Sequence, residues 1–135
     1  MEQGGQSADP PLQLELEANA PSVGLARHAV SEFAEQAGAD AGAVAIAVSE
    51  AVTNVVLHAY TDRPAGTINV SASRNGEGIL VTVQDDGRGI APNPDSPGLG
   101  FGLALVAHLA DEIGIRAPAD GGTTISMRFR YARSG

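Results

Sequence analysis

Apolar residues recur along this chain with two different periods, and the order of these segments limits the chain to a two-layer fold. Alternation at every second residue is typical of a strand with one buried face. Such strands are expected at residues 12–16, 68–72, 79–83, 113–117 and 123–131. Helical spacing occurs in residues 21–37, 40–56 and 103–113. We therefore predict an α/β two-layer sandwich, in which a mixed, mostly antiparallel sheet of about five strands carries three helices on one face.

The segment 40–56 is expected to be the central helix. Asp40 stands where its side chain can cap the first turn. The apolar stripe of this segment consists of Val44, Ala47, Val48, Ala51, Val52, Val55 and Val56. Valines late in a helix are locally unfavourable, so burial against the sheet must offset their cost. The preceding helix is expected to begin near Pro21 and to stop at Gly38.

Composition bounds the chain and excludes several kinds of site. The 135 residues suit one domain, which we place at residues 11–135 after a flexible tail at residues 1–10. Cysteine is absent, which excludes thiolate zinc sites and cysteine nucleophiles. All eight basic residues are arginines, which excludes a P-loop lysine and Schiff-base chemistry.

The formal net charge of −8 argues against nucleic acid as the main partner and favours a partner with a basic patch; the alternative is that this charge only keeps the protein soluble. No apolar run approaches the roughly 20 residues of a membrane helix. We expect a cytoplasmic protein that binds neither nucleic acid directly nor membranes.

A polar stripe runs beside the valines of the central helix. Glu50 and Asn54 are four residues apart and share a helix face, with His58 one turn further on. An amide oxygen suits Mg²⁺, which keeps several waters and also binds phosphate oxygens. A carboxylate one turn away could polarise a hydroxyl nucleophile. The alternative interpretation is a solvated helix face.

The run Asp85-Asp86-Gly87-Arg88-Gly89 follows a predicted strand. The parity of Asp85 with the apolar residues of that strand points its side chain toward the core. An inward carboxylate is costly unless it is hydrogen-bonded, and an adenine amino group is a donor of the right kind. Gly87 and Gly89 would let the backbone turn and approach the ring closely. The alternative is an exposed aspartate on an Asp-Gly turn.

A glycine run, Gly98-Leu99-Gly100-Phe101-Gly102-Leu103, leads into the third helix. Free N–H groups and the positive end of the helix dipole suit a phosphate chain. Because the run comes late in the chain, a dinucleotide-binding fingerprint fits poorly. In the last strand, Thr123 shares the inward face and could touch the same ligand, whereas Thr124 faces outward.

The order of these motifs resembles the N box, the two G boxes and the Gly-Thr-Thr strand of the GHKL ATPase superfamily, the Bergerat fold. The resemblance spans roughly residues 12–131. Within it, residues 49–54 with His58, together with residues 122–127, are most similar to the anti-sigma-factor serine/threonine kinases. Residues 98–106 resemble the G box of sensor histidine kinases about as well.

The resemblance implies that the chain binds ATP with Mg²⁺. It implies Asn54 as the metal ligand, Glu50 as the catalytic base and Asp85 as the residue at the adenine amino group. The other nucleotide-binding positions that it implies are His58, Gly87, Gly89, Gly98, Leu99, Gly100, Phe101, Gly102, Leu103 and Thr123.

The resemblance also implies partners. The chain would hold a sigma factor inactive and phosphorylate a serine or threonine of an anti-anti-sigma factor, as a possible homodimer. The loop at residues 90–97 is short and carries no basic residue. This departure leaves a second hypothesis, an ATP-binding switch without chemistry. A third hypothesis is the catalytic ATP-binding fragment of a sensor histidine kinase.

Overall fold

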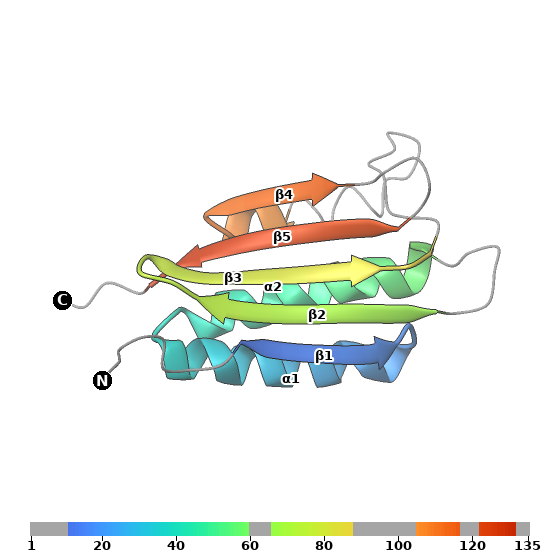
Figure 1. Ribbon diagram of the computed structural model, residues 1–135, viewed down its shortest axis with the longest axis horizontal. Helices are drawn as coiled ribbons and strands as arrows, with labels where there is room; N and C mark the ends of the chain where they lie inside the picture. Colours follow the sequence, from blue (N-terminus) through green and yellow to red (C-terminus); the bar gives the residue numbers. More distant parts are fainter. Residues whose placement is uncertain (1–10, 60–65, 88–104, 117–121, 132–135) are drawn as a thin grey trace.

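The computed structural model is a five-stranded sheet with helices packed against one face (Figure 1). The structure describes residues 11–59, 66–87, 105–116 and 122–131. The strands are β1 (Leu12–Glu17), β2 (Thr67–Arg74), β3 (Gly78–Asp85), β4 (Glu112–Arg116) and β5 (Thr123–Arg130). They lie in the order β1-β2-β3-β5-β4, and every neighbouring pair is antiparallel. The predicted sandwich is confirmed, and the described strands contain no parallel pair.

Two helices follow one another across a tight connection. Helix α1 spans Ala20–Ala37 and ends at Gly38, whose φ of 92° is left-handed and therefore favours glycine. Helix α2 spans Ala41–Asn54, and the side chain of Asp40 accepts the N–H of Ala43 at 3.1 Å. The predicted cap at Asp40 and the predicted stop at Gly38 are confirmed.

The third helix is shorter than predicted at its C-terminal end. Residues 105–109 are helical, but Ile113 belongs to β4, so the expectation that it continued the helix was wrong. Asp111 explains the change, because its N–H donates to the carbonyl of Arg128 at 2.8 Å. Its carboxylate also accepts the N–H of Arg130 at 2.7 Å. Pairing with β5 therefore begins before another helical turn can form.

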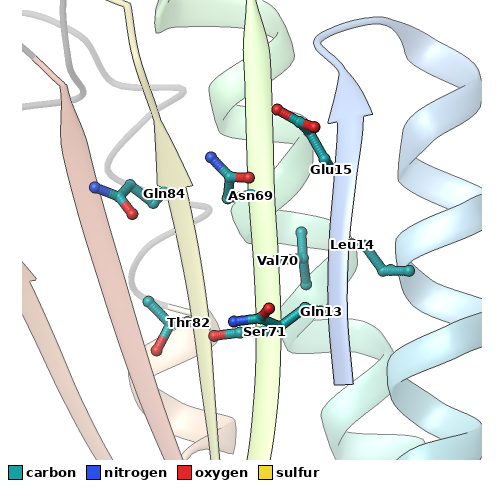
Figure 2. Close-up of a pocket in the computed structure, with 8 residues that line it drawn as sticks. All are labelled: Gln13, Leu14, Glu15, Asn69, Val70, Ser71, Thr82 and Gln84. Atoms are coloured by element: carbon teal, nitrogen blue, oxygen red, sulfur yellow. The ribbon is translucent and has the colours of Figure 1, made fainter. Parts of the chain in front are cut away.

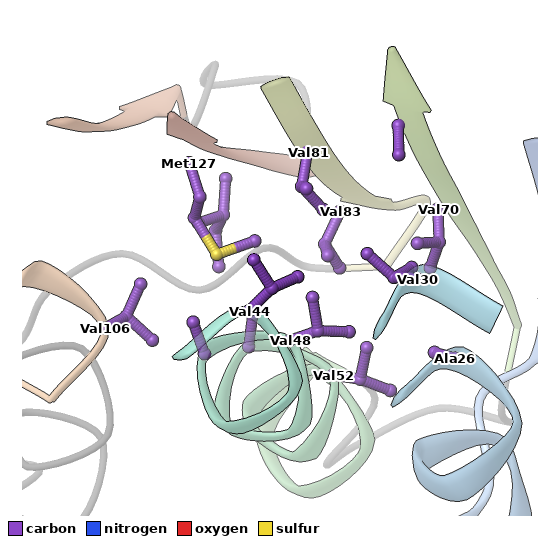
Figure 3. Close-up of a cluster of buried hydrophobic side chains, with 14 of the residues drawn as sticks. Ala26, Val30, Val44, Val48, Val52, Val70, Val81, Val83, Val106 and Met127 are labelled. Carbon is purple, nitrogen blue, oxygen red and sulfur yellow. The ribbon is translucent and has the colours of Figure 1, made fainter. Parts of the chain in front are cut away.

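The hydrophobic core lies between α1, α2 and the inner face of the sheet (Figure 3). The stripe predicted on α2 is buried, apart from the half-buried Val56. Facing it are inner-face residues of the central strands, Ile68, Val70, Ile79, Val81, Val83, Ile125 and Met127. Because side chains alternate along a strand, the outer face is left mainly to polar residues. Within the described part of the chain, no helix is long and apolar enough to span a membrane.

Replacing Ile79 by alanine tests this core. Ile79 is fully buried, so Ile79→Ala should lower the free energy of unfolding by about 2–5 kcal/mol through lost burial and a cavity. The matched control is Ile46→Ala, because Ile46 is 48% exposed on α2. The control should change the stability by about 0.5 kcal/mol or less. Urea denaturation measures both, and equal losses would contradict the assignment of the core.

Candidate functional site

Asp85 ends β3 on the inner face of the sheet, as its parity predicts. Only 3% of the residue is exposed. Its Oδ1 accepts the N–H of Gly87 at 2.9 Å, whereas its Oδ2 has no hydrogen-bond partner among the described residues. The first carboxylate oxygen is therefore held by the turn that follows the strand, and the second is buried and available to a ligand.

The surroundings of Asp85 shift its titration. Burial raises the pKa of the Asp85 carboxyl above the ordinary value of 3.8, because leaving water penalises the charged form. The carboxylate of Asp86 raises this pKa further, while the N–H groups of Gly87 and Thr123 lower it. The net direction is upward.

Thr123 lies beside Asp85. The two residues are paired between β3 and β5, and Thr123 is 2% exposed. The outward direction predicted for Thr124 agrees with its place on the other face of the strand, where it is only half-buried. The sequence therefore predicted correctly which of the two threonines stands next to the carboxylate.

Gly122 is a part of this corner that was not predicted as a site residue. Its φ of 78° is left-handed, and its N–H donates to the carbonyl of Gly87 at 2.8 Å. A Cβ at this position would lie 3.0 Å from the carbonyl oxygen of Asp85. Glycine is thus favoured twice, by conformation and by close approach. The two consecutive glycines before Thr123 were the available signal.

Asn54 is the last residue of α2. It is 5% exposed, and its Nδ2 has no hydrogen-bond partner among the described residues. Glu50 is half-buried one turn earlier in the same helix. The predicted sharing of one face therefore holds for this pair, and Asn54 is too deeply buried to be part of a solvated helix face.

The helix changes its winding directly after Asn54. Residues Val55–Ala59 form a π-helix, η1, and the N–H of Val55 contacts the carbonyls of both Ala51 and Val52. A π-turn closes with i→i+5 bonds, so four residues no longer complete a turn. The α-helical spacing used to place His58 on the face of Asn54 therefore does not apply, and the side chain of His58 lies outside the described part. Such π-turns occur frequently at functional sites.

The structure brings the amide and the carboxylate to one end of the molecule. Helix α2 packs against β3, and the end of α2 lies beside the end of β3 in Figure 1. Gly87, whose N–H donates to Asp85, is also buried. The remaining predicted positions fall outside the described residues, namely Gly89, Gly98, Leu99, Gly100, Phe101, Gly102 and Leu103.

A groove of about 440 Å³ lies elsewhere, on the outer face of β1, β2 and β3 (Figure 2). It is lined mainly by amide and hydroxyl side chains such as Asn69, Ser71 and Gln84. The inner-face carboxylate of Asp85 is on the opposite side of the sheet, so this groove is separate from the candidate site. The chemistry points to the buried corner, which contains the unpaired polar atoms.

The described residues contain no group of three or more His, Cys, Asp or Glu side chains that could hold a metal ion by themselves. A metal at Asn54 would therefore need ligands from elsewhere. An amide oxygen together with phosphate oxygens and waters is a common set for Mg²⁺. The residues present thus fit a metal that arrives with a nucleotide.

Residues 16–129 match the family described as the histidine kinase-like ATPase domain. The chain belongs to this family. This membership confirms the resemblance to the GHKL superfamily. It also implies that the nucleotide bound by this domain is ATP.

Several proteins are similar to this ATPase domain. The anti-sigma F factor of Heyndrickxia coagulans is 29% identical over 136 residues, which cover 90% of this chain and 92% of that protein. A blue-light-activated histidine kinase of Erythrobacter litoralis is 41% identical over 76 residues, which cover 55% of this chain and 22% of the kinase. The solved structure of the RsbU and RsbW domains of a Mycobacterium tuberculosis protein matches with a TM-score of 0.71 at 30% identity. That match covers 93% of this chain and 34% of the other.

Neutralising Asp85 should stabilise the ligand-free protein at neutral pH. Folding raises the pKa of Asp85, so the protonated carboxyl stabilises the folded protein. This contribution is complete when the pH is below 3.8, the ordinary pKa, and it is lost as the pH rises through the pKa of the folded protein. Asp85→Asn keeps an oxygen for the N–H of Gly87 but carries no charge. Urea denaturation should give a larger free energy of unfolding for the variant at pH 7, and the difference should shrink at about pH 3.

The matched control for this measurement is Asp111→Asn, since Asp111 is exposed and also accepts a backbone N–H. It should show no comparable gain at pH 7. A wild-type protein that is more stable than Asp85→Asn at pH 7 would contradict the unfavourable burial of this carboxylate.

Proposed function

We propose that this chain is an ATP- and Mg²⁺-dependent anti-sigma factor that sequesters a sigma factor and phosphorylates a serine or threonine of an anti-anti-sigma factor. The observation that carries the proposal is the pair of buried polar atoms, Nδ2 of Asn54 and Oδ2 of Asp85, that have no hydrogen-bond partner among the described residues. Buried polar atoms of this kind cost stability unless a ligand pairs with them.

Asp85 and Thr123 form the base-binding end of the proposed pocket. Gly87 fixes one oxygen of Asp85, so the other keeps a defined direction from which it can accept the amino group of adenine. Thr123 is paired with Asp85 across the ladder and lies against the same ligand. Gly122 keeps this corner open, because a side chain there would crowd the backbone of Asp85.

Asn54 forms the phosphate end of the pocket. Rotation of its carboxamide exchanges the two terminal atoms, so its oxygen can replace its nitrogen toward a ligand. Magnesium, when bound with the nucleotide, would neutralise phosphate oxygens. Asn54 would contribute one oxygen ligand to it, and the glycine run at residues 98–103 would contribute main-chain N–H groups, as the sequence predicts.

Glu50 is the proposed general base for phosphoryl transfer. Its carboxylate accepts the proton of the attacking serine or threonine hydroxyl. The hydroxyl oxygen then forms a bond to the γ-phosphorus, and the bond from that phosphorus to the β–γ bridging oxygen breaks. ADP leaves with the electron pair of the broken bond, and the partner carries the phosphate.

The partners are proposed from the names of the similar proteins. An anti-sigma F factor is similar over nearly the whole length of both chains, and an RsbW domain is present in the structural match. A sigma factor, an anti-anti-sigma factor and a second copy of this chain are therefore the proposed partners. A cytoplasmic location stays a prediction.

One sequence observation favours a second candidate function. Residues 90–97 bring no basic side chain toward the phosphates. A chain that binds ATP without transferring phosphate would act as a nucleotide-dependent switch on its partner.

Nucleotide binding should depend on Asn54. Asn54→Ala should weaken the affinity for Mg-ATP by at least about tenfold, since even outer-shell partners of metal ligands contribute that much. Isothermal titration calorimetry measures the effect, with Asn69→Ala as the matched control. Asn69 is an exposed amide on the outer face of β2, and its loss should leave the affinity unchanged. Equal affinities for wild type and Asn54→Ala would remove Asn54 from the site.

Phosphoryl transfer should depend on Glu50. With Mg-ATP and the cognate anti-anti-sigma factor, Glu50→Gln should lower the transfer rate by about 10²–10⁴-fold, the usual contribution of a general base, without weakening nucleotide binding. Glu35→Gln, at an exposed position of α1, is the control and should transfer at the wild-type rate. Transfer measured with labelled ATP separates the two functions. If the wild type binds nucleotide but transfers no phosphate, the nucleotide-dependent switch is the function that remains. If Glu50→Gln transfers phosphate at the wild-type rate, Glu50 is excluded as the general base.

A further inference from the structure

A small hollow lies on the outer face of the sheet, over β3, β5 and β4. It has a volume of about 220 Å³. Its lining consists of Leu80, Glu112, Ile113, Gly114, Ser126 and Arg128. It is separate from the candidate nucleotide site, because the inner-face residues Asp85 and Thr123 lie on the other side of the same sheet.

Gly114 keeps this hollow open. It is paired with Ser126, and glycine weakens a strand interior because it offers no side chain to pack. The backbone does not require glycine here, because Gly114 is not among the glycines with positive φ. A Cβ at this position would meet no heavy atom within 4 Å. Strand glycines without a local cause often mark the close approach of a ligand or of another backbone.

Arginines gather on the same face. Arg116, Arg128 and Arg130 point outward from β4 and β5, although the whole chain has a net charge of −8. Two carboxylates stand against them. Glu112 pairs with Nε of Arg128 at 3.3 Å, and Asp111 accepts the N–H of Arg130. Charge on this face is therefore locally positive in an otherwise acidic protein.

The ion pair at the rim of the hollow can exchange its partner. The side chains of Arg128 and Glu112 are 38% and 64% exposed, so water screens their attraction. A carboxylate of another protein could replace Glu112 at little cost. The outward side chain of Leu80 at the hollow would at the same time favour an apolar group.

We propose that the Gly114 hollow and the three outward arginines form a docking surface for an extended acidic segment of a partner protein. One apolar side chain of that segment would enter the hollow, and its flanking carboxylates would meet Arg116 and Arg128. The arginines supply the charge complementarity, and the rest of this acidic chain would repel such a segment. The proposal does not rest on the nucleotide site, and it is tested without nucleotide.

The probe is a synthetic peptide with a single leucine between two pairs of glutamates, added to ¹⁵N-labelled protein. Amide shifts should move at Gly114, Ser126 and Leu80 in the NMR spectrum. The dissociation constant obtained from them should rise several-fold between about 50 and 200 mM salt, because screening weakens exposed charge pairs. A peptide with glutamine in place of glutamate should bind more weakly, as should one with serine in place of leucine.

Two variants distinguish the contribution of the hollow to peptide binding from that of the arginine charges. Gly114→Val fills the hollow with a residue that strands favour, so the fold is kept while binding should weaken by about tenfold, as for loss of a central contact. Arg128→Glu should weaken binding to a similar degree, whereas Arg27→Glu, at an exposed position of α1, should not. Thermal unfolding and Mg-ATP binding report whether each variant is folded, because the proposed nucleotide site does not include the substituted residues.

Three results would overturn the proposal. One is the absence of shifts on this face at millimolar peptide. Another is wild-type affinity in Gly114→Val. The third is self-association of the protein without peptide that both variants abolish, measured by sedimentation, because the face would then be an interface between copies of this chain.

Discussion

Burial of the valine stripe of α2 against the inner face of the sheet is the interaction on which the rest of the structure depends. Each fully buried valine contributes about 1.5–3 kcal/mol, and this gain outweighs the weak helix propensity of these residues. The same contact fixes the rotation of the helix. Because Asn54 lies three residues after Ala51 and seven after Ala47, both of which are buried on the stripe, the rotation that buries the stripe also turns the amide of Asn54 inward.

Among the described residues, the candidate site is a continuation of the hydrophobic core. Asp85 continues the inner face of β3 beyond Val83, and Thr123 precedes Ile125 on β5. At this end the apolar residues give way to polar atoms that the described chain leaves unpaired. Each such atom costs about 1–3 kcal/mol. Under the proposed function a bound nucleotide would supply the missing partners, so the atoms that lower the stability of the free protein would favour binding of the ligand.

The two faces of the sheet carry different kinds of side chain. The inner face is dry and directs Asp85 into low dielectric, where its pKa rises. The outer face carries amides, hydroxyls and arginines with no described helix over it. Alternation along each strand makes the two faces independent, since neighbouring residues such as Thr123 and Thr124 contribute to opposite sides. A substitution on the outer face is thus expected to leave the corner around Asp85 intact.

The sequence by itself determined the strands, the first two helices, the stop at Gly38, the cap at Asp40 and the inward direction of Asp85, because these follow from local periodicity and turn chemistry. The sequence placed Ile113 both at the end of the third helix and at the start of a strand, and the tertiary structure decided between the two, since Asp111 bonds to β5, which is distant in sequence. The tertiary structure also decided the π-turn after Asn54 and the preference for glycine at position 122. The bonds of Asp111 to β5 and the approach of Gly122 to Asp85 are contacts between distant segments, and no local pattern encodes a distance of that kind.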